Sequence, residues 1–141
     1  MCSTRKRPSF FYEERTTGHY RNGGFSWRNR SPHENSSHLP ADLRAVVLVV
    51  QHWSPDVDWN LTSVLSKAGP LTVVLAQNGD VLEPGRIYLA PPNHHLWVKG
   101  GKARVTGGPR ENLWRPSIDT MFRSIAVQFR NRAIGVMWSA S

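Results

Sequence analysis

The apolar residues of this chain are concentrated in its C-terminal part, where strand and helix patterns alternate. Residues 45–51 (AVVLVVQ) form a nearly continuous β-branched run, which is typical of a strand buried on both faces of a sheet. Residues 59–68 place apolar side chains on one helical face, and Gly69-Pro70 ends that pattern. A second buried strand is predicted at residues 71–76. A strand, a helix and a strand of these lengths form a βαβ unit, so we expect a parallel sheet.

The segment after this unit predicts a β-hairpin. Short strands are expected at residues 86–90, 96–99 and 103–106, and Gly100-Gly101 is a turn signal between the last two. The hairpin is therefore an insertion into the α/β pattern.

The last apolar pattern predicts a helix and a final strand. Ser117 is a suitable N-cap, and the helix is expected to end near Asn131. Its apolar face would consist of Ile118, Met121, Phe122, Ile125, Ala126 and Phe129. Residues 133–138 predict the final strand. The expected fold class is an α/β domain with a doubly wound, mostly parallel sheet and an inserted β-hairpin.

Residues 1–38 show no sustained hydrophobic period. Gly, Asn, Ser, Arg and His crowd together there, and aromatic residues are scattered singly. We expect this segment to be mostly irregular, and residues 1–17 to pack poorly, because they offer no apolar face to bury.

Charge and composition narrow the classes of function. The chain of 141 residues has a net charge of +8, and residues 1–39 contribute seven basic and three acidic residues to it. A short basic terminus is usually a solvated tail, so nucleic-acid binding is the least favoured function. The run at residues 45–50 is too short to cross a bilayer, and no signal-peptide pattern is seen. The single cysteine, Cys2, excludes an internal disulfide. We expect a cytoplasmic protein without membrane insertion.

Three segments carry motifs that resemble one family in order and spacing. They are LPADLRAVVLVVQHWSP (39–55), NGDVLEPGRIYLAPPNHHLWV (78–98) and WRPSIDTMFRSIAVQFRNRAIGVMWS (114–139). Together they resemble the catalytic domain of the bacterial chemotaxis protein-glutamate methylesterases, the CheB family. That family hydrolyses methyl esters of glutamates on chemoreceptors with a serine nucleophile, a histidine base and an aspartate.

The resemblance assigns one catalytic residue. A triad serine needs a base to accept its proton, and the base needs an anion to hold its tautomer. Gln51-His52 matches the family's QH motif directly after a predicted strand, so the resemblance implies that His52 is the base. We expect His52 at the carboxyl edge of the sheet, near the start of the helix after Ser117.

Three further residues match family motifs and are candidates for the substrate cleft. His95 occupies the histidine position of A-P-x-x-x-H, and Arg115 and Ser117 belong to the R-P-S motif. Structural roles remain open for them: Arg115 as a surface cation, and Ser117, by preference, as a helix cap. His94 and His95 are adjacent on a predicted strand and so point to opposite faces; no metal site and no cofactor are expected.

Two parts of the family's active site have no match. No G-A-S-x-G-G nucleophile loop is present, and Ser26, near Gly23-Gly24, does not follow a buried strand. The family's aspartate would lie after Ser141, and Asp119 is interpreted as a first-turn helix acid, not as its substitute. We expect the fold to lack its first strand, loop and helix and its C-terminal end, and the chain to be inactive.

A frameshift is our hypothesis for the missing loop. Read one nucleotide later, codons compatible with residues 19–37 permit Ile-Ile-Val, then Met-Gly-Ala-Ser-Ala-Gly-Gly, then an amphipathic helix leading into Leu39-Pro40. The chain then divides into an irregular basic segment, residues 1–38, with residues 18–38 frameshifted, and a partial methylesterase domain, residues 39–141.

Three functions remain open, and whether the chain is an enzyme stays undecided. The first is a catalytically inactive carboxylic ester hydrolase of a family that acts on methylated cytoplasmic segments of chemoreceptors, within phosphorelay signalling. The second is a non-enzymatic module that binds chemoreceptors or signalling partners. The third is a basic nucleic-acid binder.

Overall fold

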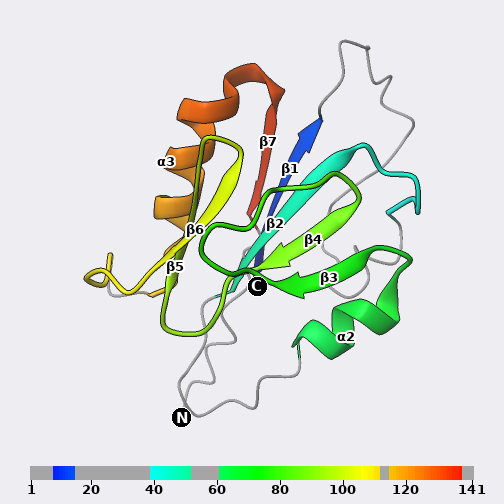
Figure 1. Ribbon diagram of the computed structural model, residues 1–141, viewed down its shortest axis with the longest axis horizontal. Coiled ribbons are helices and arrows are strands. Elements are labelled where there is room, and N and C mark those ends of the chain that lie inside the picture. Colours follow the sequence, from blue (N-terminus) through cyan, green and yellow to red (C-terminus); the bar gives the residue numbers. More distant parts are fainter. Residues whose placement is uncertain (1–7, 15–38, 52–60, 112–114, 138–141) are drawn as a thin grey trace.

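The computed structural model describes residues 8–14, 39–51, 61–111 and 115–137. Among them a five-stranded sheet with the order β3-β4-β2-β1-β7 stands beside a two-stranded sheet, β5-β6 (Figure 1). The elements are β1 (Pro8–Glu14), β2 (Ala45–Gln51), α2 (Leu61–Ala68), β3 (Thr72–Leu75), β4 (Arg86–Leu89), β5 (His95–Lys99), β6 (Lys102–Thr106), α3 (Ile118–Phe129), η1 (Arg130–Arg132) and β7 (Ala133–Met137). No helix in this part of the chain is long and apolar enough to cross a membrane.

Four of the five strands of the larger sheet run in the same direction. β3 pairs parallel with β4, and β4 pairs parallel with β2. β1 is antiparallel to β2 and also to β7, so β7 has the direction of β2. The predicted mostly parallel sheet is confirmed, with one antiparallel strand inside it.

β1 corrects one prediction. Residues 1–17 were expected to pack poorly, but Pro8–Glu14 pairs with β2 over its whole length, from Pro8↔Gln51 to Glu14↔Ala45. Its other edge pairs with β7, so β1 is an interior strand. The prediction failed because it relied on periodicity. Residues 9–12 (SFFY) favour an extended strand by their aromatic content, although no alternation marks them.

The two faces of the large sheet are covered by different elements. Successive side chains of a strand point to opposite faces, so β2 contributes to both layers. On one face Val47 and Val49 lie in a cluster with Leu65 of α2. On the other face Val46 and Leu48 lie in a cluster that includes the side chains of α3 and the hairpin. Helices on both faces make the fold doubly wound, as predicted.

The hairpin β5-β6 is fastened to α3. Its turn, Gly100-Gly101, has φ angles of 60° and 71°, which a two-residue hairpin turn requires and glycine adopts without strain. The Val98 backbone N–H donates to Ser124 Oγ at 3.0 Å, and the Gly100 N–H donates to Gln128 Oε1 at 3.1 Å. The predicted turn is confirmed, and one edge of β5 lies along the helix.

Candidate active site

His52 lies outside the described residues. The chain is described up to Gln51, the last residue of β2, which is an interior strand of the sheet. The expected position of His52 near the start of α3 therefore stays a prediction.

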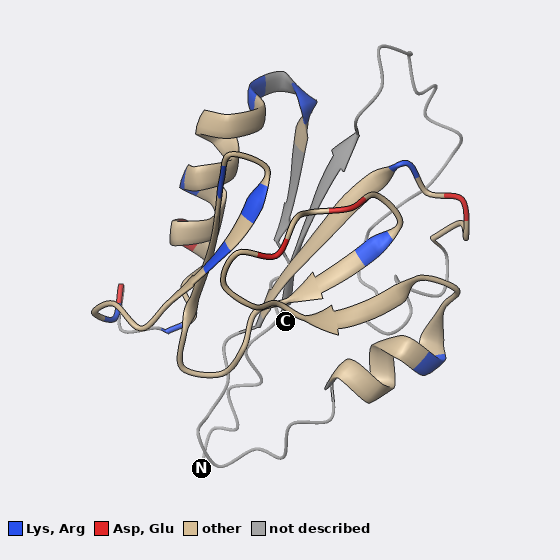
Figure 2. Ribbon diagram, viewed as in Figure 1, with Lys and Arg blue, Asp and Glu red and all other residues tan. Residues whose placement is uncertain are grey.

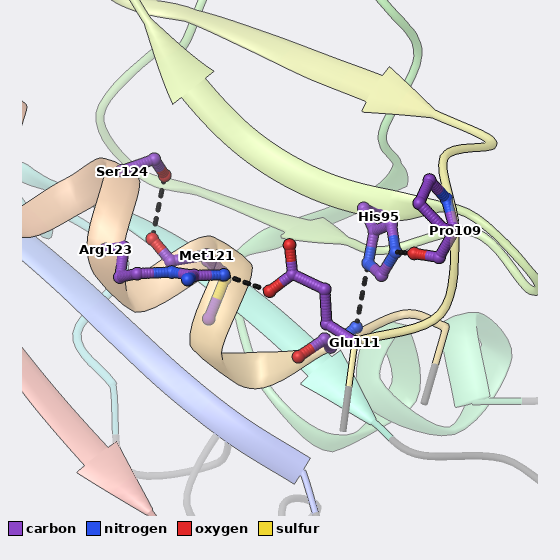
Figure 3. A network of polar contacts seen from close by, with 7 residues as sticks. His95, Pro109, Glu111, Met121, Arg123 and Ser124 are labelled. Carbon is purple, nitrogen blue, oxygen red and sulfur yellow. Dashed lines mark hydrogen bonds and ion pairs between the residues drawn. The ribbon is translucent and has the colours of Figure 1, made fainter. Parts of the chain in front are cut away.

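The structure joins the His95 side chain to the Ser117 backbone. The Ser117 N–H donates to His95 Nδ1 at 3.2 Å, and His95 Nε2 lies 2.7 Å from the Pro109 carbonyl oxygen (Figure 3). A carbonyl oxygen can only accept, so Nε2 carries the hydrogen and Nδ1 is the acceptor. The ring is therefore held in one neutral tautomer by two backbone groups from different segments.

These two bonds limit what His95 can do. The residue is only 4% exposed, and both ring nitrogens are already engaged. A substrate would find no free nitrogen on this imidazole. His95 connects the start of β5, the loop after β6 and the first turn of α3, which is a positioning role.

Arg115 connects two loops through neutral acceptors. Its Nε and Nη2 donate to Asn93 Oδ1 at 3.0 and 2.7 Å, and its Nη1 donates to the carbonyls of Gly107 and Gly108 at 3.2 and 3.1 Å. Guanidinium offers several donors in one plane, which suits this fork of contacts. Arg115 therefore does more than a solvated surface cation. It holds the loop before β5 against the loop after β6.

Ser117 occupies the N-cap position of α3, as predicted, but its hydroxyl forms no capping bond. Its backbone is extended (φ −106°, ψ 133°), and the residue is buried. Ser117 instead contributes its backbone N–H, which donates to His95. Asp119 lies in the first turn of α3, where the sequence predicted a helix acid.

The motif segment around Gly79-Asp80 and Tyr88 has a structural explanation. Asp80 Oδ2 accepts the Gln77 N–H at 2.8 Å and closes a turn. The Tyr88 hydroxyl donates to the Val81 carbonyl at 3.1 Å and accepts the Glu83 N–H at 2.9 Å. These contacts fix the loop that borders β6, so this motif supports the hairpin.

Sequence reasoning missed several residues of this network. Asn93 was not singled out, and Gly107 and Gly108 were interpreted as turn residues. Their contribution is made by a side-chain amide and two carbonyl oxygens that face Arg115. Backbone acceptors leave no mark in residue type, and the Gly-Gly-Pro run at residues 107–109 was the available signal.

His94 and His95 use separate contacts. His94 Nδ1 lies 2.8 Å from the Pro92 carbonyl oxygen and is exposed, whereas His95 is buried against Pro109. Among the described residues, no group of three or more His, Cys, Asp and Glu could hold a metal ion.

Fold and network together define a doubly wound α/β domain in which motif residues gather between the hairpin and the start of α3. The family model for CheB methylesterase matches residues 34–141, and this chain belongs to that family. The crystal structure of the Thermotoga maritima CheB methylesterase catalytic domain is similar, with a TM-score of 0.65 and 27% identity over 72% of this chain and 58% of that one.

Curated relatives carry a consistent name. The protein-glutamate methylesterase/protein-glutamine glutaminase 4 of Myxococcus xanthus (strain DK1622) is 41% identical over 102 residues, which is 72% of this chain and 29% of the relative. The protein-glutamate methylesterase/protein-glutamine glutaminase 2 of Methanosarcina acetivorans is 37% identical over 107 residues, 70% of this chain and 30% of the relative. The chain thus spans about three tenths of the length of these relatives.

Proposed function

We propose that this chain is a protein-glutamate methylesterase domain that has lost its nucleophile loop. Its ancestral reaction is hydrolysis of glutamyl methyl esters on cytoplasmic segments of chemoreceptors, in bacterial chemotaxis signalling. The proposal rests on one observation above all: the motif residues His95 and Arg115 both bond to the loop after β6, His95 to Pro109 and Arg115 to Gly107 and Gly108, and His95 also accepts the Ser117 N–H. The named function of the relatives supports the same reaction.

The proposed roles follow from the chemistry of ester hydrolysis. His52 accepts the proton of a serine hydroxyl, which attacks the ester carbonyl and releases methanol. His95 and Arg115 do not react; they hold the loops and the helix start that form the wall of the cleft. Residues 18–38 contain no G-A-S-x-G-G sequence, so this chain does not supply the nucleophile motif that the reaction requires.

A comparison of three proteins tests the proposal. They are this chain, the chain with residues 18–38 replaced by the shifted reading, and that restored chain with a C-terminal extension carrying the family's aspartate. Methanol release from a methylated receptor should be absent in the first and clear in the third, because loss of a triad nucleophile removes nearly all turnover. A His52→Ala change should abolish the activity of the third. Robust turnover by the first protein that survives Ser26→Ala would contradict our account of the defect.

The alternative function is a binding module without catalysis. One observation favours it: the contacts of Arg115 and of His95 with the loop after β6 are formed in this chain, which has no G-A-S-x-G-G sequence. A receptor segment that binds the unrestored chain but is not demethylated by it would support this alternative.

A further inference from the structure

One face of the hairpin carries cations and one tryptophan. We name Trp97, Lys99, Lys102 and Arg104 the cationic hairpin face. Trp97 is directly opposite Arg104, and Lys99 is directly opposite Lys102. Both lysines are exposed, and the other two residues are partly exposed. The intervening residues of the hairpin point the other way, into the core with α3.

Within the described parts of the chain, the cations of this face have no ion-pair partner. Like charges directly opposite each other on paired strands repel, so the Lys99 and Lys102 pair costs stability. No described residue forms an ion pair with Lys99, Lys102 or Arg104. Of the acids in the loop that borders β6, Glu83 pairs with Arg86 at 3.0 Å, and Asp80 accepts the Gln77 backbone N–H without forming an ion pair to the hairpin.

Further cations lie near the tip of the hairpin. The Gly100 N–H bonds to Gln128 in the last turn of α3, which places the tip beside the end of that helix. Arg130 and Arg132, both exposed, follow directly in η1. Figure 2 shows the basic segments on the hairpin and at this end of α3. Charge of one sign is therefore concentrated here.

The cationic hairpin face is continuous with the candidate active site. β5 begins at His95, and β6 leads into Gly107 and Gly108, whose carbonyls bind Arg115. From His95 to Lys99 a strand rises roughly 13 Å. A segment whose reacting group lies near the His95 network could thus contact the lysines with groups a few residues farther along.

We propose that the cationic hairpin face binds an acidic protein segment, namely the glutamate-rich stretch that carries the esters. This inference rests on the proposed function, because it names the docking surface for the same substrate. Each hydrolysed ester leaves a carboxylate, so a stretch with several sites becomes anionic and complementary to the lysines. The half-buried Trp97, whose indole N–H donates to Thr106 Oγ1, offers apolar surface for the methylene stems of glutamate.

Binding of a labelled peptide tests the inference with the full chain. The probe is a fluorescein-labelled glutamate-rich helical peptide, followed by anisotropy at low salt, and its matched peptide has every glutamate replaced by glutamine. Lys99→Glu/Lys102→Glu should weaken binding about tenfold, because two attractions become repulsions. The control Arg44→Glu/Lys67→Glu makes the same change in net charge at exposed positions, directly before β2 and on α2, and should leave affinity nearly unchanged.

Several results would overturn the inference. They are equal losses in the two double variants, equal binding of the glutamine peptide, or tighter binding of single-stranded DNA than of the peptide at the same salt concentration. If the lysine variant unfolds, Lys99→Gln/Lys102→Gln provides the same test with a smaller loss. Binding needs no catalysis, so the two proposals can fail separately. Specific peptide binding by a restored chain that hydrolyses no ester would reject the proposed function but support the cationic hairpin face as a binding surface.

Discussion

Hydrogen-bond direction determines the role of an imidazole more strongly than its position in a motif. His95 occupies the histidine position of A-P-x-x-x-H, yet a backbone N–H and a backbone carbonyl take both of its nitrogens. Arg115 is similar, since its contacts are an amide oxygen and two carbonyls. Both residues therefore act on the geometry of the loops, and a catalytic imidazole has to come from elsewhere, as His52 is expected to do.

Replacing His95 should destabilise the fold, whereas replacing its neighbour should not. His95→Ala leaves the buried N–H of Ser117 without a partner, which costs about 1–3 kcal/mol, and it also removes the partly buried bond to the Pro109 carbonyl. We expect a loss of about 2–4 kcal/mol in the free energy of unfolding, measured by urea denaturation. His94→Ala, at an exposed position, should cost less than about 1 kcal/mol. Similar losses in the two variants would show that the two bonds contribute little.

At the level of elements, β1 connects the two parts of the large sheet. It supplies the backbone partners that β2 and β7 need between them, because these two strands do not pair with each other. An interior strand has a neighbour on both edges, so each N–H along it faces another chain segment. The hairpin shows a different solution: on the open edge of β5, the Val98 N–H donates to the Ser124 hydroxyl of α3.

A proline in β1 tests whether its ladder stabilises the protein. Phe11 is opposite Leu48 on β2 and Gly135 on β7. Phe11→Pro removes an N–H from an interior strand, whereas Phe11→Ala removes the side chain but keeps the N–H. We expect the proline variant to be less stable than the alanine variant by about 2–3 kcal/mol in urea denaturation. Equal stability of the two variants would contradict an interior position for β1.

Elements with strong local patterns were predictable from the sequence. The buried run of β2 and the turn at Gly100-Gly101 were found where the pattern predicted them. The apolar face of α3 was predicted with one error: Met121, Ile125 and Phe129 are buried, and Ile118 and Phe122 are partly buried, but Ala126 is exposed. β1 was missed because its strand is stabilised by pairing with segments far away in the chain, which periodicity does not record. For the same reason the partners of Arg115 were missed, as they are mostly backbone carbonyls of a loop.

At the level of the whole molecule, the topology restricts where a restored first strand could go. In the shifted reading of residues 18–38, a strand is followed by a helix that leads into β2, which makes a βαβ unit. Such a unit places its two strands parallel, and consecutive strands are usually neighbours. β2 has two neighbours, β4 and β1. β4 is held parallel to both β2 and β3, so the position of β1 is the one that the restored strand would take.

We therefore predict that restoring residues 18–38 displaces β1 from the sheet. The new strand would lie between β2 and β7, which already run in the same direction, and all five strands would then be parallel. Its Ile-Ile-Val core is more apolar than residues 8–14, which end in Glu13-Glu14, so burial favours replacement of β1 by the new strand.

Hydrogen–deuterium exchange with mass spectrometry measures this replacement directly: protection at residues 8–14 should fall in the restored chain, and protection should arise at residues 19–21. The amides of β4, Arg86–Leu89, should be protected equally in both proteins and serve as the internal control. Continued protection of residues 8–14 beside an unprotected new strand would contradict the exchange and the frameshift hypothesis with it.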